Sequence, residues 1–563
     1  MEVRMKENRL AKWWKREWTT CLKAAILACL PIIACLVYCA GKGQSIGRVY
    51  LPASGRNDEL IYYKQVEAIL RYGYPQGYFG FNESHALKLS FASWSPALML
   101  PWVLWGLAFG WNLMSPVLCN IFLLTIAMLL FGLLAKPDWK QLGIMTLLFF
   151  LFVPFSWYML CGMPEIGCIS LLIVFYGAAV AWLRKRGNGP LLGVMFALAG
   201  LLTLMRPYLL LFLFLPAYFW IAGTDGMARK EDAPAQKRGK RILRGIAARW
   251  REILGSAVVM ISVLGIYAWM NHFLAAEYLE PLFYMDWLTG FFEKGFLGGL
   301  RYFLGSLYYS GLEFLRYMWQ GITVGRAAGS IFCCYIAVFL LLLFQSVRDF
   351  TALRRGRKRG GDCGELYGQL VLEGHLAFAF LGMLFAQLLM YNFFDGCKHL
   401  LTFLAAGIFV IGRMRTVYFK KAILTGVVFA WFFFYRGAGF EDYEADFVQE
   451  AVVERMDSFS EAVEGKLTLT GDVRPNYDNV VIWVLSDELP EGVVYTGWQY
   501  LYSLPAGFGI SCCTSDYVME QFEALKSRYI CVVPGGPIEA KCLQTGYEKI
   551  AGNEYAVLYC SRP

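Results

Sequence analysis

The first long apolar stretch of the chain reads CLKAAILACLPIIACLVYCA and covers residues 21–40. Twenty residues of this composition match the length that a transmembrane helix needs to cross a hydrocarbon core of about 30 Å. A basic segment precedes the stretch, with Arg9, Lys12, Lys15 and Arg16 close to its start. No small-residue cleavage site follows it, so the sequence predicts a retained signal anchor with a cytoplasmic N-terminus.

The rest of the chain repeats this pattern. Apolar residues make up 58% of the 563 residues and charged residues only 17%, which is too apolar a balance for a soluble globule. We therefore predict an α-helical polytopic membrane protein. The eleven expected spans are the apolar runs at about 21–40, 116–135, 142–158, 165–183, 190–205, 207–223, 252–272, 329–347, 371–392, 399–412 and 421–436.

The basic residues support this arrangement, because Lys and Arg accumulate in the cytoplasmic loops of membrane proteins. With eleven spans, every strongly basic loop is cytoplasmic, namely Lys136/Lys140, 184–186, 229–251, 354–359 and 413–421. These loops supply most of the net charge of +9 and normally face anionic lipid, so the charge requires no nucleic-acid partner. Counting the segment from Pro96 to Trp111 as a further span would place Lys136 and the basic residues 184–186 outside the cytoplasm. We expect it to be an interfacial or re-entrant helix, with twelve spans as the alternative.

Three segments remain outside the cytoplasm: residues 41–115, residues 273–328 and everything after Arg436. The sequence thus divides into a membrane domain at 1–436 and an extracytoplasmic domain at 437–563. Short apolar strands alternating with helices predict a small α/β layer for the second domain. Its expected elements are a helix at 443–463, a strand at 479–485, a helix at 516–526 and strands at 529–533 and near 554–560. Its cysteines are an odd set that sequence cannot pair: Cys512, Cys513, Cys531, Cys542 and Cys560.

The first outside loop carries an acidic pair, Asp58-Glu59, directly before a helical pattern. A helix N-terminus favours negative charge, and capping alone would explain one acidic residue there. The position of the pair, soon after the first span, favours a functional role. The loop then continues through Glu83 and His85 to Trp94-Ser95-Pro96 and the interfacial segment.

In this loop and in its overall plan, the sequence resembles the GT-C class of membrane glycosyltransferases. That class includes the protein mannosyltransferases (glycosyltransferase family 39) and the aminoarabinose transferases of lipid A. The resemblance rests on Asp58-Glu59 with Tyr62 or Tyr63 after it, on the interfacial helix, on the many spans and on the external C-terminal domain. The Trp-Trp-Asp-Tyr-Gly motif of oligosaccharyltransferases is absent from the sequence.

The resemblance implies an enzyme that moves a sugar from a polyprenyl-phosphate donor to a cell-envelope glycan, lipid or protein acceptor. The reaction would take place on the extracytoplasmic face of the cell membrane. Such chemistry needs a carboxylate to accept the proton of the attacking hydroxyl and cations to stabilise the departing phosphate. The family implies Asp58 as the base, with Glu59 as its neighbour and substitute.

The spans themselves, without the family resemblance, identify cations at the outside ends of the expected helices. Arg206 interrupts two apolar runs, where a charge is unfavourable unless it is paired or solvated. Lys398 and His399 lie between two later spans, close to Asp395. We predict that these cations bind the phosphate of the donor. The alternatives are snorkelling of Arg206 and Lys398 to the membrane interface, and a structural hydrogen bond for His399.

Glu165, Glu83 and His85 complete the predicted substrate-binding set, since each lies outside and near the same membrane face. Glu165 also follows Pro164, so the beginning of a helix is an alternative explanation for it. The sequence shows no metal-ligand cluster, and it is compatible with a divalent metal without requiring one. A transporter or lipid flippase without covalent chemistry would fit the hydropathy, although paired broken helices and internal symmetry are missing.

Overall fold

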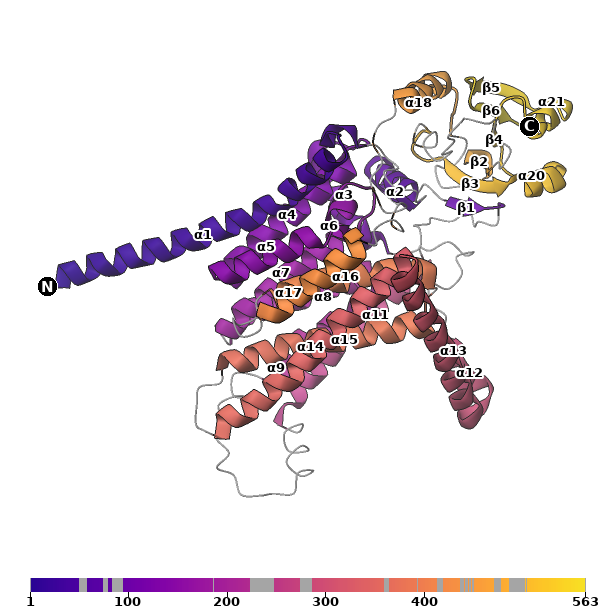
Figure 1. The fold of residues 1–563 in the computed structure, drawn as a ribbon. Coiled ribbons are helices and arrows are strands. Elements are labelled where there is room, and N and C mark those ends of the chain that lie inside the picture. The colour runs from indigo at the N-terminus through magenta and orange to yellow at the C-terminus, as the bar shows by residue number, and fades with distance from the viewer. Residues whose placement is uncertain are drawn as a thin grey trace.

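The structure is a computed structural model of the whole chain. It describes residues 2–49, 58–73, 79–83, 95–185, 187–222, 248–273, 286–358, 364–391, 393–412, 419–435, 440, 444, 447, 450–469, 477–485, 502 and 504–561. A bundle of helices forms one part of the molecule, and a small sheet domain lies at one end of it (Figure 1).

Six helices in the described part of the chain are long and apolar enough to cross a membrane. They are α1 (Glu2–Gly41, apolar from Glu17), α4 (Ser115–Ala135), α7 (Glu165–Arg184), α11 (Trp250–Phe273), α14 (Ala327–Lys358) and α15 (Gly364–Leu389). Each coincides with an expected span. The prediction of a helical polytopic membrane protein with a small C-terminal sheet domain is confirmed.

The other five expected spans also coincide with helices, but these are shorter. They are α5 (Trp139–Leu151), α8 (Gly189–Met205), η3 (Pro207–Leu213) continuing into α9 (Phe214–Ala222), α16 (Phe393–Ile411), and α17 (Phe419–Ala430) continuing into the π-helical turn η6 (Trp431–Tyr435). The segment expected at the interface forms η2 (Pro96–Leu98) and α3 (Leu100–Phe109). Ten helical residues extend about 15 Å, which is half the thickness of a bilayer core.

Prolines accompany two helix breaks, one inside the expected span 142–158 and one between the expected spans 190–205 and 207–223. Proline lacks a main-chain N–H, so it cannot continue the hydrogen bonds of a helix from the preceding turn. Helix α5 ends before Pro154, where the short helix α6 (Pro154–Met159) begins. Between α8 and η3, Arg206 precedes Pro207 and is extended, with φ −146° and ψ 110°. This break places Arg206 at a junction rather than inside a continuous helix.

The C-terminal domain is a six-stranded mixed sheet in the order β1-β3-β2-β4-β6-β5. Its strands are β1 (Phe79–Phe81), β2 (Val480–Leu485), β3 (Gly509–Thr514), β4 (Tyr529–Val532), β5 (Glu548–Gly552) and β6 (Val557–Cys560). Strands β1, β3, β2 and β4 pair in parallel with one another, whereas β6 pairs in antiparallel fashion with both β4 and β5. The helices of the domain are α18 (Glu450–Val463), α20 (Ser515–Gln521) and α21 (Pro537–Gln544).

Strand β1 comes from the first outside loop and not from the range 437–563. Phe79 is in register with Ile510 and Phe81 with Cys512, both on β3. One face of the sheet packs with α20 and α21 in a core of its own. Trp483 on the other face belongs to the large core that also contains the helical bundle. The first loop therefore contributes one strand to the sheet of the C-terminal domain.

The segment 273–328, which was predicted to lie outside, contains α12 (Asp286–Glu293) and α13 (Gly295–Thr323), which extend away from the bundle at the end that carries the sheet domain (Figure 1).

The five cysteines of the C-terminal domain are all free thiols. A disulfide, which the sequence left open, is not formed among these five.

Candidate functional site

Helix α2 (Asp58–Tyr72) begins at the predicted acidic pair. Asp58 is its first residue, and the side chain of Asp58 lies outside the described part of the structure. The Glu59 side chain is fully buried, and its Oε2 accepts a hydrogen bond of 2.8 Å from the main-chain N–H of Gly162. A Cβ at position 162 would lie 2.9 Å from that oxygen, so the contact depends on glycine.

The turn that contains Gly162 is held by Asn120, a fully buried residue of α4. The amide group of Asn120 donates to the carbonyl oxygens of Tyr158, Cys161 and Met163 at 3.0, 3.1 and 3.2 Å. Its own oxygen accepts a hydrogen bond of 3.0 Å from the indole of Trp102, on α3. A buried amide with these partners satisfies main-chain groups that would otherwise lack them. The interfacial helix, α4 and the turn are therefore fixed against each other.

Glu165 begins α7 just after this turn and forms an ion pair with Arg206. The Nη2 atom of Arg206 lies 2.6 Å from Oε1 of Glu165, and the two residues are 1% and 2% exposed. Two predicted site residues, 41 positions apart, are thus in direct contact. Ions buried in a bundle require such pairing, since each alone would lose several kcal/mol of hydration. The pairing leaves the Arg206 and Glu165 charges mutually compensated.

Tyrosines lie near this ion pair, and His399 contacts two of them. Arg206 lies within electrostatic range of Tyr62, which α2 contributes, and of Tyr208. The His399 ring lies 5.2 Å from that of Tyr208 and 5.4 Å from that of Tyr391, measured between centroids. Arg206 also lies within electrostatic range of Tyr391. The acidic-loop helix, the α8–η3 junction and the start of α16 therefore meet in one buried cluster.

Lys398 precedes His399 on α16, and both side chains are buried. The Lys398 side chain, at 9% exposure, packs inside the protein instead of extending from its surface as a snorkelling lysine would. The side chain of Asp395, the expected partner of Lys398, lies outside the described part of the structure. The phosphate-binding role of Lys398 and His399 stays a prediction.

Glu83 lies in the C-terminal domain, away from this cluster. Its Oε1 accepts hydrogen bonds of 3.1 and 2.7 Å from the main-chain N–H groups of Lys526 and Ser527. Its own N–H donates to Oγ of Ser511 at 3.0 Å. These contacts join the first loop to the sheet. The substrate-binding role of Glu83 stays a prediction, and His85 lies outside the described residues.

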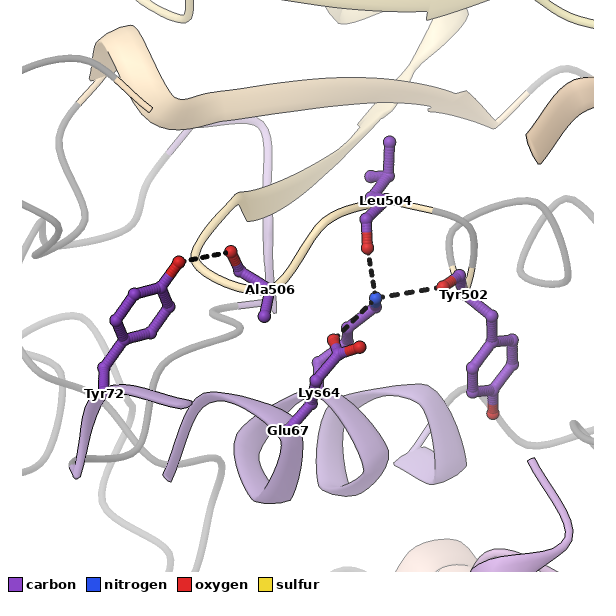
Figure 2. Close-up of polar contacts among 6 residues, drawn as sticks. All are labelled: Lys64, Glu67, Tyr72, Tyr502, Leu504 and Ala506. Carbon is purple, nitrogen blue, oxygen red and sulfur yellow. Dashed lines mark hydrogen bonds and ion pairs between the residues drawn. The ribbon is translucent and has the colours of Figure 1, made fainter. Parts of the chain in front are cut away.

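Lys64, a buried lysine that was not among the predicted site residues, connects α2 to the C-terminal domain (Figure 2). Its ammonium group donates to the main-chain oxygens of Tyr502, at 3.0 Å, and of Leu504. It also pairs with Glu67 at 2.9 Å, one turn further along α2. Only the burial of Lys64, which its sequence neighbourhood does not reveal, distinguishes it from a solvated helix lysine.

Aromatic residues make further contacts that hold α2 in place. The Tyr72 hydroxyl donates to the Ala506 carbonyl at 3.1 Å (Figure 2). The Tyr63 ring stacks on Trp111 at 5.2 Å and meets the Tyr502 ring edge-on at 5.1 Å. Burial raises the pKa of the Tyr63 hydroxyl well above its usual range, so it stays protonated. Helix α2 is held between the C-terminal domain and the segment that follows α3.

Among the described residues, no group of three or more His, Cys, Asp and Glu side chains gathers in the arrangement of a metal site. The described residues of the cluster are the Glu165 carboxylate, the cation Arg206, the His399 imidazole and the tyrosine hydroxyls around them.

No protein-family model matches this chain, and no curated protein matches it. Similar solved structures include the oligosaccharyltransferase of Archaeoglobus fulgidus in complex with zinc and sulfate. It shows 14% identity and a TM-score of 0.47 over 90% of this chain and 67% of that one. ArnT from Cupriavidus metallidurans bound to undecaprenyl phosphate shows 10% identity and a TM-score of 0.36 over 95% and 97% of the two chains. Both similarities are distant, so a functional proposal has to rest on the residues of this chain.

Proposed function

We propose that this chain is a membrane glycosyltransferase. It would transfer a sugar from a polyprenyl-phosphate donor to a cell-envelope acceptor at the membrane face that carries the C-terminal domain. One observation carries the proposal: the helix that begins with Asp58-Glu59 contributes Tyr62 to the surroundings of Arg206, whose charge is buried and paired. In this proposal the acidic loop and the buried cation, 148 positions apart from Asp58 to Arg206, would belong to one site.

Asp58 is the proposed base. It precedes Tyr62 by four positions on α2, and residues at this spacing share a helix face. The acceptor hydroxyl would attack the anomeric carbon of the donor and pass its proton to the Asp58 carboxylate. The bond between that carbon and the phosphate oxygen would break, and its electron pair would leave with the lipid phosphate. Glu59, fully buried and bound to Gly162, would position the start of α2 rather than accept the proton.

The departing phosphate needs positive charge as its own negative charge develops. Arg206 is largely compensated by Glu165 at 2.6 Å. We assign direct phosphate contact to Lys398, with His399 beside it, and a positioning role to the Arg206–Glu165 pair. The pair would hold Tyr62 and Tyr208 around the reacting groups.

The proposal is tested in cells by comparing strains that carry the gene, lack it, or carry the Asp58→Asn variant. Mass spectrometry of lipid extracts should show one polyprenyl-phosphate sugar accumulating in the second and third strains. The corresponding sugar should disappear from an envelope glycan, lipid or protein. Unchanged lipid-linked sugars and unchanged envelope glycans in the strain without the gene would overturn the proposal.

A flippase could cause the same accumulation, so a second arm uses permeabilised membranes, in which both faces are accessible. Transport is then dispensable, and transfer to the acceptor should still require the gene and Asp58. Transfer that becomes independent of the gene after permeabilisation would favour the transporter instead.

A further inference from the structure

A basic cavity of about 980 Å³ lies between α1, α4, α7 and α8, at the end of the bundle opposite the C-terminal domain (Figure 1). The loops that border it carry the charges from which the sequence predicted the cytoplasmic side. The lining residues are Thr19, Thr20, Lys23, Leu133, Leu134, Lys136, Ala181, Arg184, Lys185, Asn188 and Leu191. The lining thus includes four cations and no carboxylate.

Three of these cations, Lys23, Lys136 and Arg184, are held at the cavity by hydrogen bonds to main-chain carbonyls or by an ion pair. Lys23 donates to the Pro137 carbonyl, and the guanidinium of Arg184 donates to the Leu134 carbonyl at 3.1 Å. Lys136 lies 3.4 Å from Glu17 in an ion pair whose two side chains are more than one-third exposed. Such a pair is weak, so it leaves most of the positive potential in place. With Glu17 included, the cavity keeps a formal charge of +3.

An exposed apolar surface on α4 adjoins this basic cavity. Leu133 lines the cavity, and Leu130 and Ile126 follow it along one face of α4 at helical spacing. These three side chains are 37%, 38% and 37% exposed, on a helix long and apolar enough to span a membrane. A ligand with an anionic head and an apolar tail would match both features, whereas a free anion would use only the first.

We propose that this cavity is a binding site for the phosphodiester headgroup of an anionic phospholipid, with an acyl chain along the Ile126–Leu133 face of α4. Lysine and arginine donors suit phosphate oxygens, and basic pockets between membrane helices are suited to anionic lipid headgroups. The site is separate from the proposed glycosyl-transfer site, and the proposal does not depend on it.

The test uses the full-length protein in detergent and native mass spectrometry with three probes: phosphatidylglycerol, phosphatidylcholine and inorganic phosphate. The test variant is Lys136→Asn with Lys185→Gln. Lys136 has φ +44°, a left-handed conformation that asparagine tolerates better than most residues. The matched control is Lys294→Gln with Arg301→Gln, which removes two exposed cations at the α12–α13 turn and the first turns of α13, away from the cavity. Lys185→Gln alone, at an exposed position, serves if the double variant is poorly folded.

Wild-type protein and the control should retain phosphatidylglycerol in preference to phosphatidylcholine. The test variant should lose about ten- to thirty-fold of that retention, because each cation near a lipid surface contributes about 1 kcal/mol. Equal retention of the two lipids, or unchanged retention in the folded test variant, would overturn the proposal. Full displacement of phosphatidylglycerol by equimolar inorganic phosphate would also overturn it, since the cavity would then be a free-anion site.

Discussion

Lys64 donates a hydrogen bond of 3.0 Å to the main-chain carbonyl of Tyr502, a residue 438 positions later in the chain. The lysine is 2% exposed and belongs to the helix that begins with Asp58-Glu59. The position of the acidic pair therefore depends on the C-terminal domain. This domain acts as part of the scaffold of the candidate site and not as a separate attachment.

We expect Lys64→Met to weaken this connection. Methionine keeps the length and apolar stem but leaves the carbonyl groups of Tyr502 and Leu504 without their donor, at a cost of about 1–3 kcal/mol for each buried acceptor. Limited proteolysis should release the C-terminal domain faster, and kcat for sugar transfer should fall more than the KM for the donor changes. The control is Lys466→Met, at an exposed position after α18. Equal protease resistance in both variants would contradict the prediction.

Asp58→Asn should abolish sugar transfer while expression and membrane insertion stay nearly normal. Asparagine keeps the size and the capping ability of aspartate, so a purely structural residue would tolerate the change. Loss of a general base typically lowers the rate 10²- to 10⁴-fold. The rate should be measured by following the donor lipid in membranes that contain equal amounts of each protein.

Glu59→Gln is the companion variant to Asp58→Asn. Because the Glu59 carboxylate accepts its hydrogen bond from Gly162, glutamine can keep the contact through its own oxygen. We expect it to retain more activity than Asp58→Asn. Full activity in the Asp58→Asn, Glu59→Gln double variant would eliminate the acidic pair as the catalytic centre.

The buried pair of Glu165 and Arg206 predicts a non-additive effect on stability. Glu165→Gln or Arg206→Met alone leaves one uncompensated buried charge, which typically destabilises by about 3–5 kcal/mol. The double variant removes both charges and should be more stable than either single variant. Thermal unfolding in detergent, arranged as a double-mutant cycle, measures the difference. Additive losses of Tm would show that the two residues do not depend on each other.

The thiol of Cys513 should react slowly in the folded protein. Burial raises its pKa from 9.0 to about 11, and the thiolate is the reactive form. At pH 8 about one thiol in a thousand is then ionised, and alkylation should accelerate roughly tenfold per pH unit up to pH 11 while the fold persists. Mass spectrometry after iodoacetamide treatment measures this, with partly exposed Cys560 as the faster internal control. Equal rates at pH 8 would mean that the strand is open.

Orientation in the membrane remains a prediction from loop charge. The N-terminus and the loops at 224–251 and 348–366 should be cytoplasmic, with residues 437–563 outside. Protease added to intact protoplasts should remove the C-terminal domain and leave the basic loops uncut. Protection of that domain together with cleavage between 224 and 251 would reverse the topology.

The helical architecture follows from the sequence, because hydropathy is a local property that can be summed along a run such as residues 21–40. The same is true of strands β2 and β4, whose continuous apolar runs are typical of strands buried on both faces. Strand β1 was not expected, since three residues are too few to show a period, and its partner β3 lies more than 400 positions away. The expected helix at 443–463 is shorter in the structure, beginning at Glu450.

For the candidate site, the sequence shows that Arg206 must be either paired or solvated, because a charge between two apolar runs is unfavourable without one of the two. That it is paired, and that its partner is Glu165, depends on how α7 packs against the α8–η3 junction. The same holds for Lys64, which reads as an ordinary helix lysine until the segment around Tyr502 folds over it. The sequence around a charged residue shows whether that residue needs a partner. Which distant residue becomes the partner depends on how the helices and the C-terminal domain pack, and a short stretch of sequence carries no information about that packing.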